Sequence, residues 1–503
     1  MRDRCCRPCP PAAPPVHRPA KPRGAHEPER PDRIDAYVWR VTWVAVLGSV
    51  MSILDTTIVN VALDTLARDL HAPIARTQWV ITGYLLALAV VIPASGWTAR
   101  RFGARRVYMA ALVLFTAGSA LCGLAHSITI LVVFRVVQGV GGGVIGPVGQ
   151  MMIAEAAGPK RMGRVMAVVG VATVLAPVFA PTLGGVILDH LAWQWIFYVN
   201  VPIGAVALLA AWRVLPNLVP RPAGRLDVLG AGLLAVGIPA VVYGLSEIGT
   251  TGGFASAKVI GPIVIGIGLV VGFVRHALRA ERPLLDLRLY AKVAFAAASL
   301  TTFAVGMALF GALILMPLYF QQVRHYNVLV TGLLVAPGAI GAVIAMPISG
   351  RLTDRIGGGR IALVGVLITS AGTVPLALMG AHTSLWVIGA AQVIRGLGIG
   401  LAFVPAMSAA LASVSPNQLS DASPQMSVLQ RVSAAIGTAV LAVVLQRPIA
   451  AAGHPSTPAA LAGAFDTAFW WALGITLLAA LPCALLIRAE RLPREGQASK
   501  PSR

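Results

Sequence analysis

Long, continuous apolar runs separated by short polar or basic connections dominate the chain. A membrane-spanning helix needs about 20 predominantly apolar residues, and the runs reach this length. They do not alternate between apolar and polar positions, and they are far longer than the roughly ten residues of a membrane-barrel strand. The pattern therefore predicts an all-α integral membrane protein that resides in the lipid bilayer.

Fourteen spans are predicted, an even number. They lie at 41–65, 78–98, 106–126, 128–153, 165–188, 195–215, 227–246, 258–275, 292–320, 329–349, 361–380, 385–412, 426–446 and 467–487. Residues 1–40 are rich in proline and arginine and contain no apolar segment, so they are predicted to form a disordered cytoplasmic tail. Residues 488–503 are predicted to form a second cytoplasmic tail.

Only 12% of the 503 residues are charged, yet the net charge is +21. In a soluble protein this charge would suggest a nucleic-acid partner. Its placement excludes that interpretation, because the basic residues gather in every second connection: Arg100, Arg101, Arg105, Arg106, Lys160, Arg161, Arg164, Arg213, Arg221, Arg225, Arg275, Arg279, Arg282, Arg288, Lys292, Arg351, Arg355 and Arg360. By the positive-inside rule these connections are cytoplasmic, and both termini lie on the same side of the inner (plasma) membrane.

Two segments recur about half a chain apart. The loop GWTARRFGARR at 96–106 returns as GRLTDRIGGGR at 350–360, and RVVQGVGGGVIGP from Arg135 returns as QVIRGLGIGLAFVP from Gln392. Such an internal repeat predicts two six-helix halves, at 41–215 and 291–487, with two extra helices and a cytoplasmic linker at 216–290 between them. A substrate site is expected near the membrane midplane, where the halves meet.

The ordered set of motifs resembles the major facilitator superfamily, and within it the fourteen-span drug:proton antiporters of the EmrB/QacA type. It comprises LDTTIVNVAL at 54–63, the two loops, RVVQGVGGG at 135–143, APVFAPTLGG at 176–185 and WQWIFYVNVPIG at 193–204. The sequence departs from the family pattern at Asp64, where proline is usual, and at Ala176 and Ala180, where glycine is usual. The resemblance implies the major facilitator fold and export of a small-molecule substrate in exchange for protons.

The loops and the fifth span contain the candidate gating residues: Gly96, Arg101, Gly103, Arg106, Pro177, Pro181, Gly184, Gly185, Gly350, Asp354, Arg355 and Gly357. In the family, an aspartate at the fifth loop position helps to hold one conformational state. Asp354 retains this acid whereas Arg100 replaces it, so the lock is expected to be weak at the first loop, and Asp354→Asn is expected to matter more than Arg100→Gln. The alternatives are that the loop arginines only set topology and that the prolines only kink a span.

Asp55 is the only acid clearly inside a predicted span, where a charge costs about 2.5–3.5 kcal/mol. Glu155, Asp189, Glu247 and Asp466 lie near span ends. Helix geometry puts Arg135 at a similar depth to Asp55, and the resemblance implies that both helices face the central cavity. Asp55 and Arg135 are therefore the predicted proton-coupling pair. A fixed ion pair that only holds two helices together is the alternative.

Adaptable aromatic and methionine side chains, with a few amides, are typical of a cavity for varied apolar ligands. The predicted cavity residues are Asn60, Trp79, Tyr84, Gln138, Phe303, Met307, Phe310, Tyr319, Gln322 and Gln430, together with Met316, Gln321 and Met426. Helix packing or lipid contact is the alternative for each of them.

These features predict a proton-coupled exporter of amphipathic compounds, cationic or neutral. Alternatives are a dedicated exporter of one endogenous metabolite or antibiotic, a non-transporting receptor and an intramembrane enzyme. The sequence contains neither H-E-x-x-H nor G-x-x-x-x-G-K-[ST], so no enzyme, metal, cofactor or ATP dependence is predicted. A periplasmic adaptor protein is neither predicted nor excluded.

Overall fold

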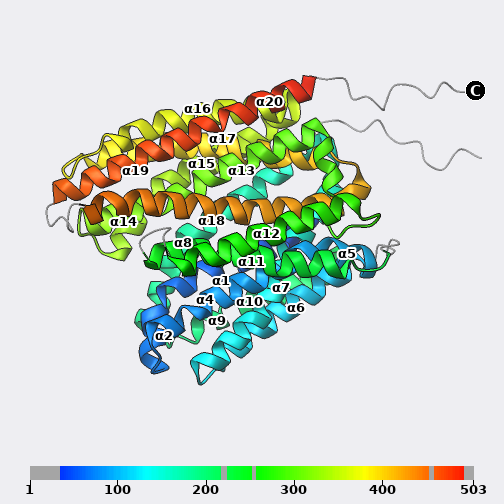
Figure 1. The fold of residues 1–503 in the computed structure, drawn as a ribbon, viewed down its shortest axis with the longest axis horizontal. Helices are drawn as coiled ribbons and strands as arrows, with labels where there is room; N and C mark the ends of the chain where they lie inside the picture. Colours follow the sequence, from blue (N-terminus) through cyan, green and yellow to red (C-terminus); the bar gives the residue numbers. More distant parts are fainter. Residues whose placement is uncertain (1–33, 217–223, 252–255, 452–457, 492–503) are drawn as a thin grey trace, which may run out of the picture.

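The computed structural model describes residues 34–216, 224–251, 256–451 and 458–491, and this part of the chain folds into helices without a strand. Fourteen helical stretches in it are long and apolar enough to cross a membrane. They run side by side along the long axis of the molecule (Figure 1). The predicted all-α class and span number are thereby confirmed.

The first six spans form one group of helices. They are α1 (Ala36–Val61); α4 (Trp79–Val91) continued by η1 (Ile92–Ala94) and α5 (Ser95–Phe102); α6 (Ala104–Gly123); α7 (Ile128–Ala157); η2 (Pro159–Arg161) with α8 (Met162–His190); and α9 (Trp195–Tyr198) with α10 (Asn200–Val214). Short helices α2 (Leu63–Asp69) and α3 (Ile74–Thr77) connect α1 to α4.

The remaining spans comprise the extra pair and a second group of six. The extra pair is α11 (Val228–Thr251) and α12 (Ala257–Arg279), followed by η3 (Leu287–Ala291). The second group is α13 (Val293–Leu313) with α14 (Leu315–Gln322); α15 (Val328–Ile356); α16 (Gly358–Ala377); α17 (Leu385–Ala412); η4 (Pro416–Gln418) with α18 (Leu419–Ala451); and α19 (Pro458–Leu478) with α20 (Ala480–Arg491).

Several helices extend beyond the predicted spans. At the starts of α1 and α16, acidic side chains accept the free backbone N–H groups of the first turn. The Asp35 side chain accepts the Tyr37 N–H, so α1 begins inside the segment predicted as a disordered tail. At the other end of the chain α20 continues to Arg491, and Glu490 accepts the backbone N–H groups of Gly358 and Gly359 at the start of α16. Residues 36–40 are therefore helical where disorder was predicted, and 488–491 extend the last helix into the predicted cytoplasmic tail. The other predicted tail residues lie outside the described part, except Ile34 and Asp35.

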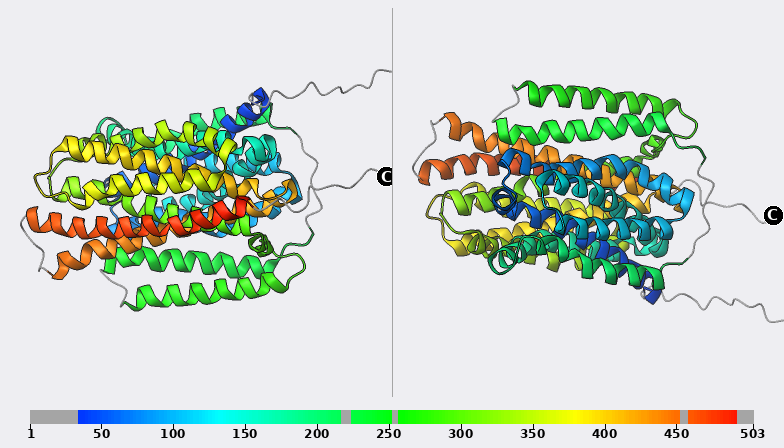
Figure 2. Two further views of the ribbon diagram at one scale, coloured as in Figure 1. Left: turned by 90° about the horizontal axis from the view of Figure 1, so that it is seen from above. Right: turned by 90° about the horizontal axis from the view of Figure 1, so that it is seen from below.

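The extra pair lies on the outer face of the bundle, across the junction of the two groups (Figures 1 and 2). There α11 contacts α4 of the first group and α18 of the second. Asp227 anchors the pair, since its carboxylate accepts the N–H groups of Gly230 and Leu284 and lies 2.8 Å from His276 Nε2. A side chain at Gly266 would meet the backbone of α11, so glycine here permits the two helices to pack closely.

The two groups are packed together at one end of the molecule and apart at the other. At the end with the basic loops, one buried apolar cluster contains Met166 of the first group as well as Met346 and Val404 of the second. At the opposite end each group has a cluster of its own, represented by Ile58 in the first and Phe465 in the second. The structure is therefore closed at the basic end.

Candidate functional site

A polar cluster lies inside the first group of helices, around Asp55 of α1. Asp55 and Arg135 are fully buried, and Arg135 Nη1 lies 2.5 Å from Asp55 Oδ2. The other carboxylate oxygen accepts hydrogen bonds from Gln138 Nε2 at 2.8 Å and from Asn200 Nδ2 at 3.0 Å. Asp55 is thus bound by side chains from α7 and α10, and the predicted contact with Arg135 is present.

Further contacts hold the Arg135 guanidinium in place. Its Nε donates to the Val80 carbonyl at 3.1 Å, its Nη1 also donates to Gln138 Oε1 at 2.8 Å, and its Cζ lies 4.1 Å from the centre of the Tyr84 ring. Gln138 and Tyr84, which were predicted to line the substrate cavity, belong to this cluster instead. The sequence reasoning missed Asn200, although it stands in the quoted WQWIFYVNVPIG motif.

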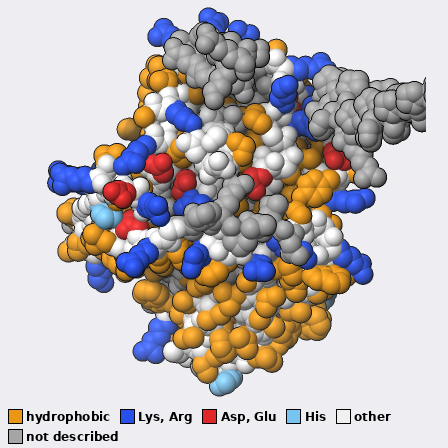
Figure 3. Space-filling model, turned by 90° about the vertical axis from the view of Figure 1, so that its right-hand side faces the viewer, with side chains coloured by type: hydrophobic (Ala, Val, Ile, Leu, Met, Phe, Trp, Pro, Cys, Tyr) orange, Lys and Arg blue, Asp and Glu red, His pale blue; other side chains and the backbone are white. Residues whose placement is uncertain are grey.

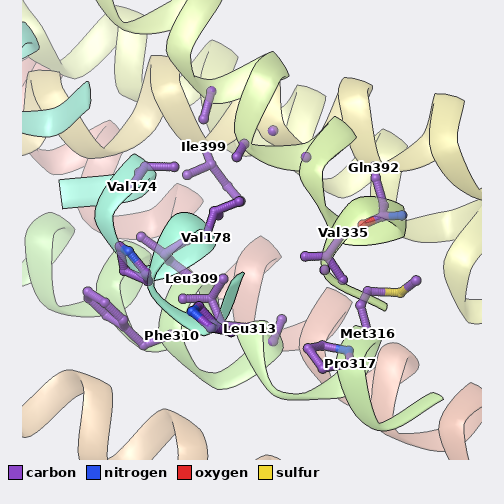
Figure 4. Close-up of a pocket in the computed structure, with 18 of the residues that line it drawn as sticks. Val174, Val178, Leu309, Phe310, Leu313, Met316, Pro317, Val335, Gln392 and Ile399 are labelled. Carbon is purple, nitrogen blue, oxygen red and sulfur yellow. The ribbon is translucent and has the colours of Figure 1, made fainter. Parts of the chain in front are cut away.

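A cavity of about 510 Å³ lies between α8 and the helices α13, α14, α15 and α17 of the second group, with the end of α1 at its border. This volume suits a drug-sized ligand. Val174, Val178 and Phe310 are among its many apolar side chains, and Gln392 lies across the space from them (Figure 4). Among the described residues, Arg395 is the only charged residue in the lining.

Only some of the predicted cavity residues line this space. Asn60, Phe310, Met316 and Gln321 do so, as do the candidate gating residues Pro177 and Pro181. The others are absent from the lining: Trp79, Tyr84, Gln138, Phe303, Met307, Tyr319, Gln322, Gln430 and Met426.

Packing explains several of these absences. Trp79 is 45% exposed and stacks on Tyr243 of the extra pair. Tyr319 is buried and donates its hydroxyl to the Gly380 carbonyl, and Met426 is part of the core at the closed end. Aromatic and methionine side chains pack helices as well as they line cavities, so residue type alone does not separate the two roles.

At the closed end, an ion pair joins the first basic loop, at 96–106, to the second group of helices. Arg100 Nη1 of α5 donates to Asp421 Oδ1 at 2.8 Å and to Ser420 Oγ at 2.9 Å, both in α18. Gly96 lies so close to the Ser420 carbonyl that a side chain would collide with it. Although Arg100 stands where the family has an acid, it finds an acidic partner in Asp421 on the opposite helix.

The second loop makes the corresponding contact with charges reversed. Asp354 of α15 accepts the Gly163 N–H at 2.8 Å and the Arg164 Nε at 3.0 Å, at the start of α8. Gly350 lies against the backbone of Gly163, as Gly96 does against Ser420. Each loop therefore contacts the first turn of a helix in the other group.

The other candidate gating residues fall into two sets. Gly103 and Gly357 have φ of +89° and +92°, a conformation that favours glycine, and each precedes the next helix. Arg101, Arg106 and Arg355 are exposed at the closed end, where Lys and Arg side chains gather on the surface (Figure 3).

In the fifth span, the two glycines of the motif have different surroundings. A side chain at Gly184 would meet Ile58 of α1, whereas Gly185 has open space beside it. The fifth span therefore packs closely on α1 at Gly184, and the cavity begins one turn away at Pro181.

Residues 45–438 match the family model described as Major Facilitator Superfamily. The chain belongs to this superfamily. It is 41% identical over 418 residues, 82% of this chain and 77% of the relative, to the multidrug resistance protein B homolog of Mycobacterium tuberculosis (strain ATCC 25618 / H37Rv). It is 31% identical over 406 residues to the multidrug export protein EmrB of Haemophilus influenzae, covering 80% of this chain and 79% of the relative.

Solved structures share the fold of this superfamily member. The human organic anion transporter MFSD10 (TETRAN) superposes with a TM-score of 0.63 at 18% identity, over 89% of this chain and 99% of that one. The proton:xylose symporter XylE superposes with a TM-score of 0.61 at 14% identity, over 89% and 95%. The family match and the multidrug relatives show that the chain is a multi-pass membrane transporter of small molecules, as the motifs predict, and not an enzyme.

Proposed function

We propose that this transporter is a proton-coupled antiporter that exports amphipathic organic compounds across the inner membrane. The buried Asp55 carboxylate beside Arg135 is the observation that carries the proposal, because a buried acid in a transporter helix is a natural proton carrier. The names of the multidrug relatives and the apolar cavity favour a broad exporter over one dedicated to a single metabolite or antibiotic.

Proton binding at Asp55 is coupled to conformation through charge balance. While Asp55 is ionised, it neutralises Arg135 and accepts the amide hydrogen bonds of Gln138 and Asn200. Protonation removes this balance and leaves a buried, unpaired guanidinium, which is costly. The protonated cluster therefore favours a conformation in which the surroundings of Arg135 change, and this couples the proton to the movement of the helices.

The contacts at the basic end define the movement that export requires. In the positive-inside orientation this end is cytoplasmic, so the structure represents a state closed to the cytoplasm. Substrate uptake from the cytoplasm requires both loop contacts, Arg100 with Asp421 and Asp354 with Arg164, to break. The cavity beside α8 then changes its exposure from one side of the membrane to the other.

Transport by purified protein in liposomes with an imposed pH gradient tests the proposal. We expect Asp55→Asn to abolish proton-driven export and Asp55→Glu to retain part of it. Asp64→Asn is the matched control, because Asp64 is an exposed acid in α2 and should not affect export. Export by Asp55→Asn at the wild-type rate under the gradient would show that another group carries the proton.

A further inference from the structure

Arg395 of α17 is a buried cation that pairs with none of the residues that the structure describes. It is only 9% exposed, lines the cavity, and makes no hydrogen bond or ion pair with the described residues. Arginine is almost never buried unless it is paired, and a charge within a membrane helix carries a further cost. The side chain therefore lacks the anion that would balance it.

The internal repeat shows what is missing. When Gly139 is aligned with Gly396, the Arg-x-x-Gln of α7 corresponds to a Gln-x-x-Arg in α17, formed by Gln392 and Arg395. In the first half, Arg135 and Gln138 both bind the Asp55 carboxylate, which comes from the first span of that half.

The second half has the same two side-chain types without the acid. Its first span, formed by α13 and α14, contains no Asp or Glu anywhere in 293–322. Gln392 is 4% exposed and donates to the Leu334 carbonyl at 2.9 Å, which fixes it beside the cavity. The arginine and the amide are thus present in the second half, and the first span of that half supplies no carboxylate to pair with them.

We propose that the cavity binds amphipathic organic anions, whose carboxylate or similar acid group pairs with Arg395. This assignment rests on the proposed export function and names the class of its substrate. A planar guanidinium is well suited to a carboxylate, because it donates two parallel hydrogen bonds. The apolar part of the ligand would lie against Val174, Val178 and Phe310 (Figure 4).

The positive charge of Arg395 disfavours binding of cationic compounds, which are among the substrates expected from the sequence. No acid lines the cavity within the described part of the chain, and Asp55 is fully buried and already paired. A cationic ligand would lie near an unbalanced Arg395, where like charges repel.

Binding of three probes that share one ring system tests the proposal. They are 2-naphthylacetate as the anion, 2-naphthylacetamide as the neutral compound and 2-(2-naphthyl)ethylammonium as the cation, each titrated calorimetrically into the full chain in lipid nanodiscs. We expect the anion to bind most tightly. Arg395→Gln should weaken anion binding about tenfold to a hundredfold and leave amide binding nearly unchanged. Arg395→Lys should retain part of the anion preference, because it keeps the charge but loses the paired donors.

Arg431→Gln is the matched control, since Arg431 is a basic residue of the spanning helix α18 that does not line the cavity. It should leave the affinity for the anion unchanged. An equal loss in Arg431→Gln, an equal weakening of all three probes in Arg395→Gln, or tighter binding of the cation by the wild type would each overturn the proposal. Binding of the neutral amide probe shows that each variant is folded. If Arg395→Gln does not bind the amide, the Arg395→Lys variant is used instead, and full anion affinity in that variant would contradict the pairing of two guanidinium N–H groups with the acid group.

Transport of the same probes separates this inference from the proposed function. Anion binding that depends on Arg395, without proton-driven export in liposomes, would contradict the antiporter proposal and leave the anion site intact. Proton-driven export of the ammonium probe by a protein that shows no anion preference would contradict only the anion site.

Discussion

The ion pair between Arg100 and Asp421 shows how a single residue can depart from a family pattern without loss of the contact. Its side chains are 18% and 17% exposed, so the pair is largely shielded from solvent. Asp354 and Arg164 form the corresponding pair with the acid and the base exchanged. The first loop therefore supplies the base and the second loop the acid, yet each forms an ion pair with the first turn of a helix in the other half.

Reversing the charge of Arg100 should open the closed end of the molecule, and reversing the charge of its partner Asp421 as well should close it again. Arg100→Asp places two carboxylates together, which should shift the equilibrium toward the open state by about 1 kcal/mol or more. The double variant Arg100→Asp with Asp421→Arg should return toward wild type. Spin labels at exposed Phe102 and Ile356, one in each half, measure the opening as a distance, in a background without native cysteines. A double variant as open as the single one would show that the pair contributes no specific contact.

At the same scale, the sequence predicted Arg135 as a partner of Asp55 but missed Gln138 and Asn200, and it predicted only a few of the cavity residues. Asp55 and Arg135 could be matched because the rise of a helix fixes the depth of each residue, and charges in spans are few. Arg395 could not be assigned from the sequence, because its proposed role depends on the absence of an acid in 293–322, which becomes relevant only through the packing of α13 beside α17.

At the scale of helices, glycine determines how closely the halves approach. Gly350 and Gly163 lie backbone to backbone, and a side chain at either position would meet the carbonyl of the other. Gly350→Val should force α15 away from α8 and lengthen the distance between the labels at the closed end. Gly474→Val in α19 is the control, because that glycine has open space beside it. An unchanged distance in Gly350→Val would mean that the helices can adjust without opening.

A second helix contact should affect stability rather than opening. Glu490 of α20 caps the start of α16 through the N–H groups of Gly358 and Gly359. We expect Glu490→Gln to destabilise the fold by about 0.5–2 kcal/mol, the usual contribution of a helix cap, and to lower the melting temperature. Exposed Glu281 supplies the control variant Glu281→Gln, and an identical melting temperature for both variants would exclude a capping role.

The number of spanning helices could be predicted from the sequence, because it follows from the number and length of the apolar runs. The residues at which the helices end could not be predicted in this way. The predicted tail at 488–503 is polar, yet its first residues continue α20, and Glu490 among them accepts backbone N–H groups from the start of α16. Such contacts join residues more than a hundred positions apart, so no local pattern reveals them.

At the scale of the whole molecule, the distribution of charge predicts orientation. Reporter fusions after Arg106 and after Arg360 should both report a cytoplasmic location, since these positions follow the two basic loops at the closed end. A periplasmic signal from either fusion would contradict the proposed orientation. The conformational state was not predictable, because it depends on how Met346 and Val404 fit against Met166 across the halves.

The proposed substrate charge determines how the whole transporter responds to membrane potential. When one proton enters and one neutral molecule leaves, one positive charge moves inward. When one proton enters and one monoanion leaves, the net movement equals two positive charges inward, because the departing negative charge counts as a second one. A potential supplies about 2.3 kcal/mol per charge per 100 mV, which is about a tenfold concentration ratio per 60 mV for each charge.

In liposomes without a pH gradient and with an imposed inside-negative potential, the steady-state gradient of 2-naphthylacetate should therefore rise about twice as steeply, on a logarithmic scale, as that of 2-naphthylacetamide. Protein-free liposomes correct for passive movement of the anion, and Asp55→Asn should abolish the proton-coupled component for both probes. Equal slopes for the two probes would show that the anion does not cross with its charge. A response of the anion that persists in Asp55→Asn would show that potential drives it without the proton carried at Asp55.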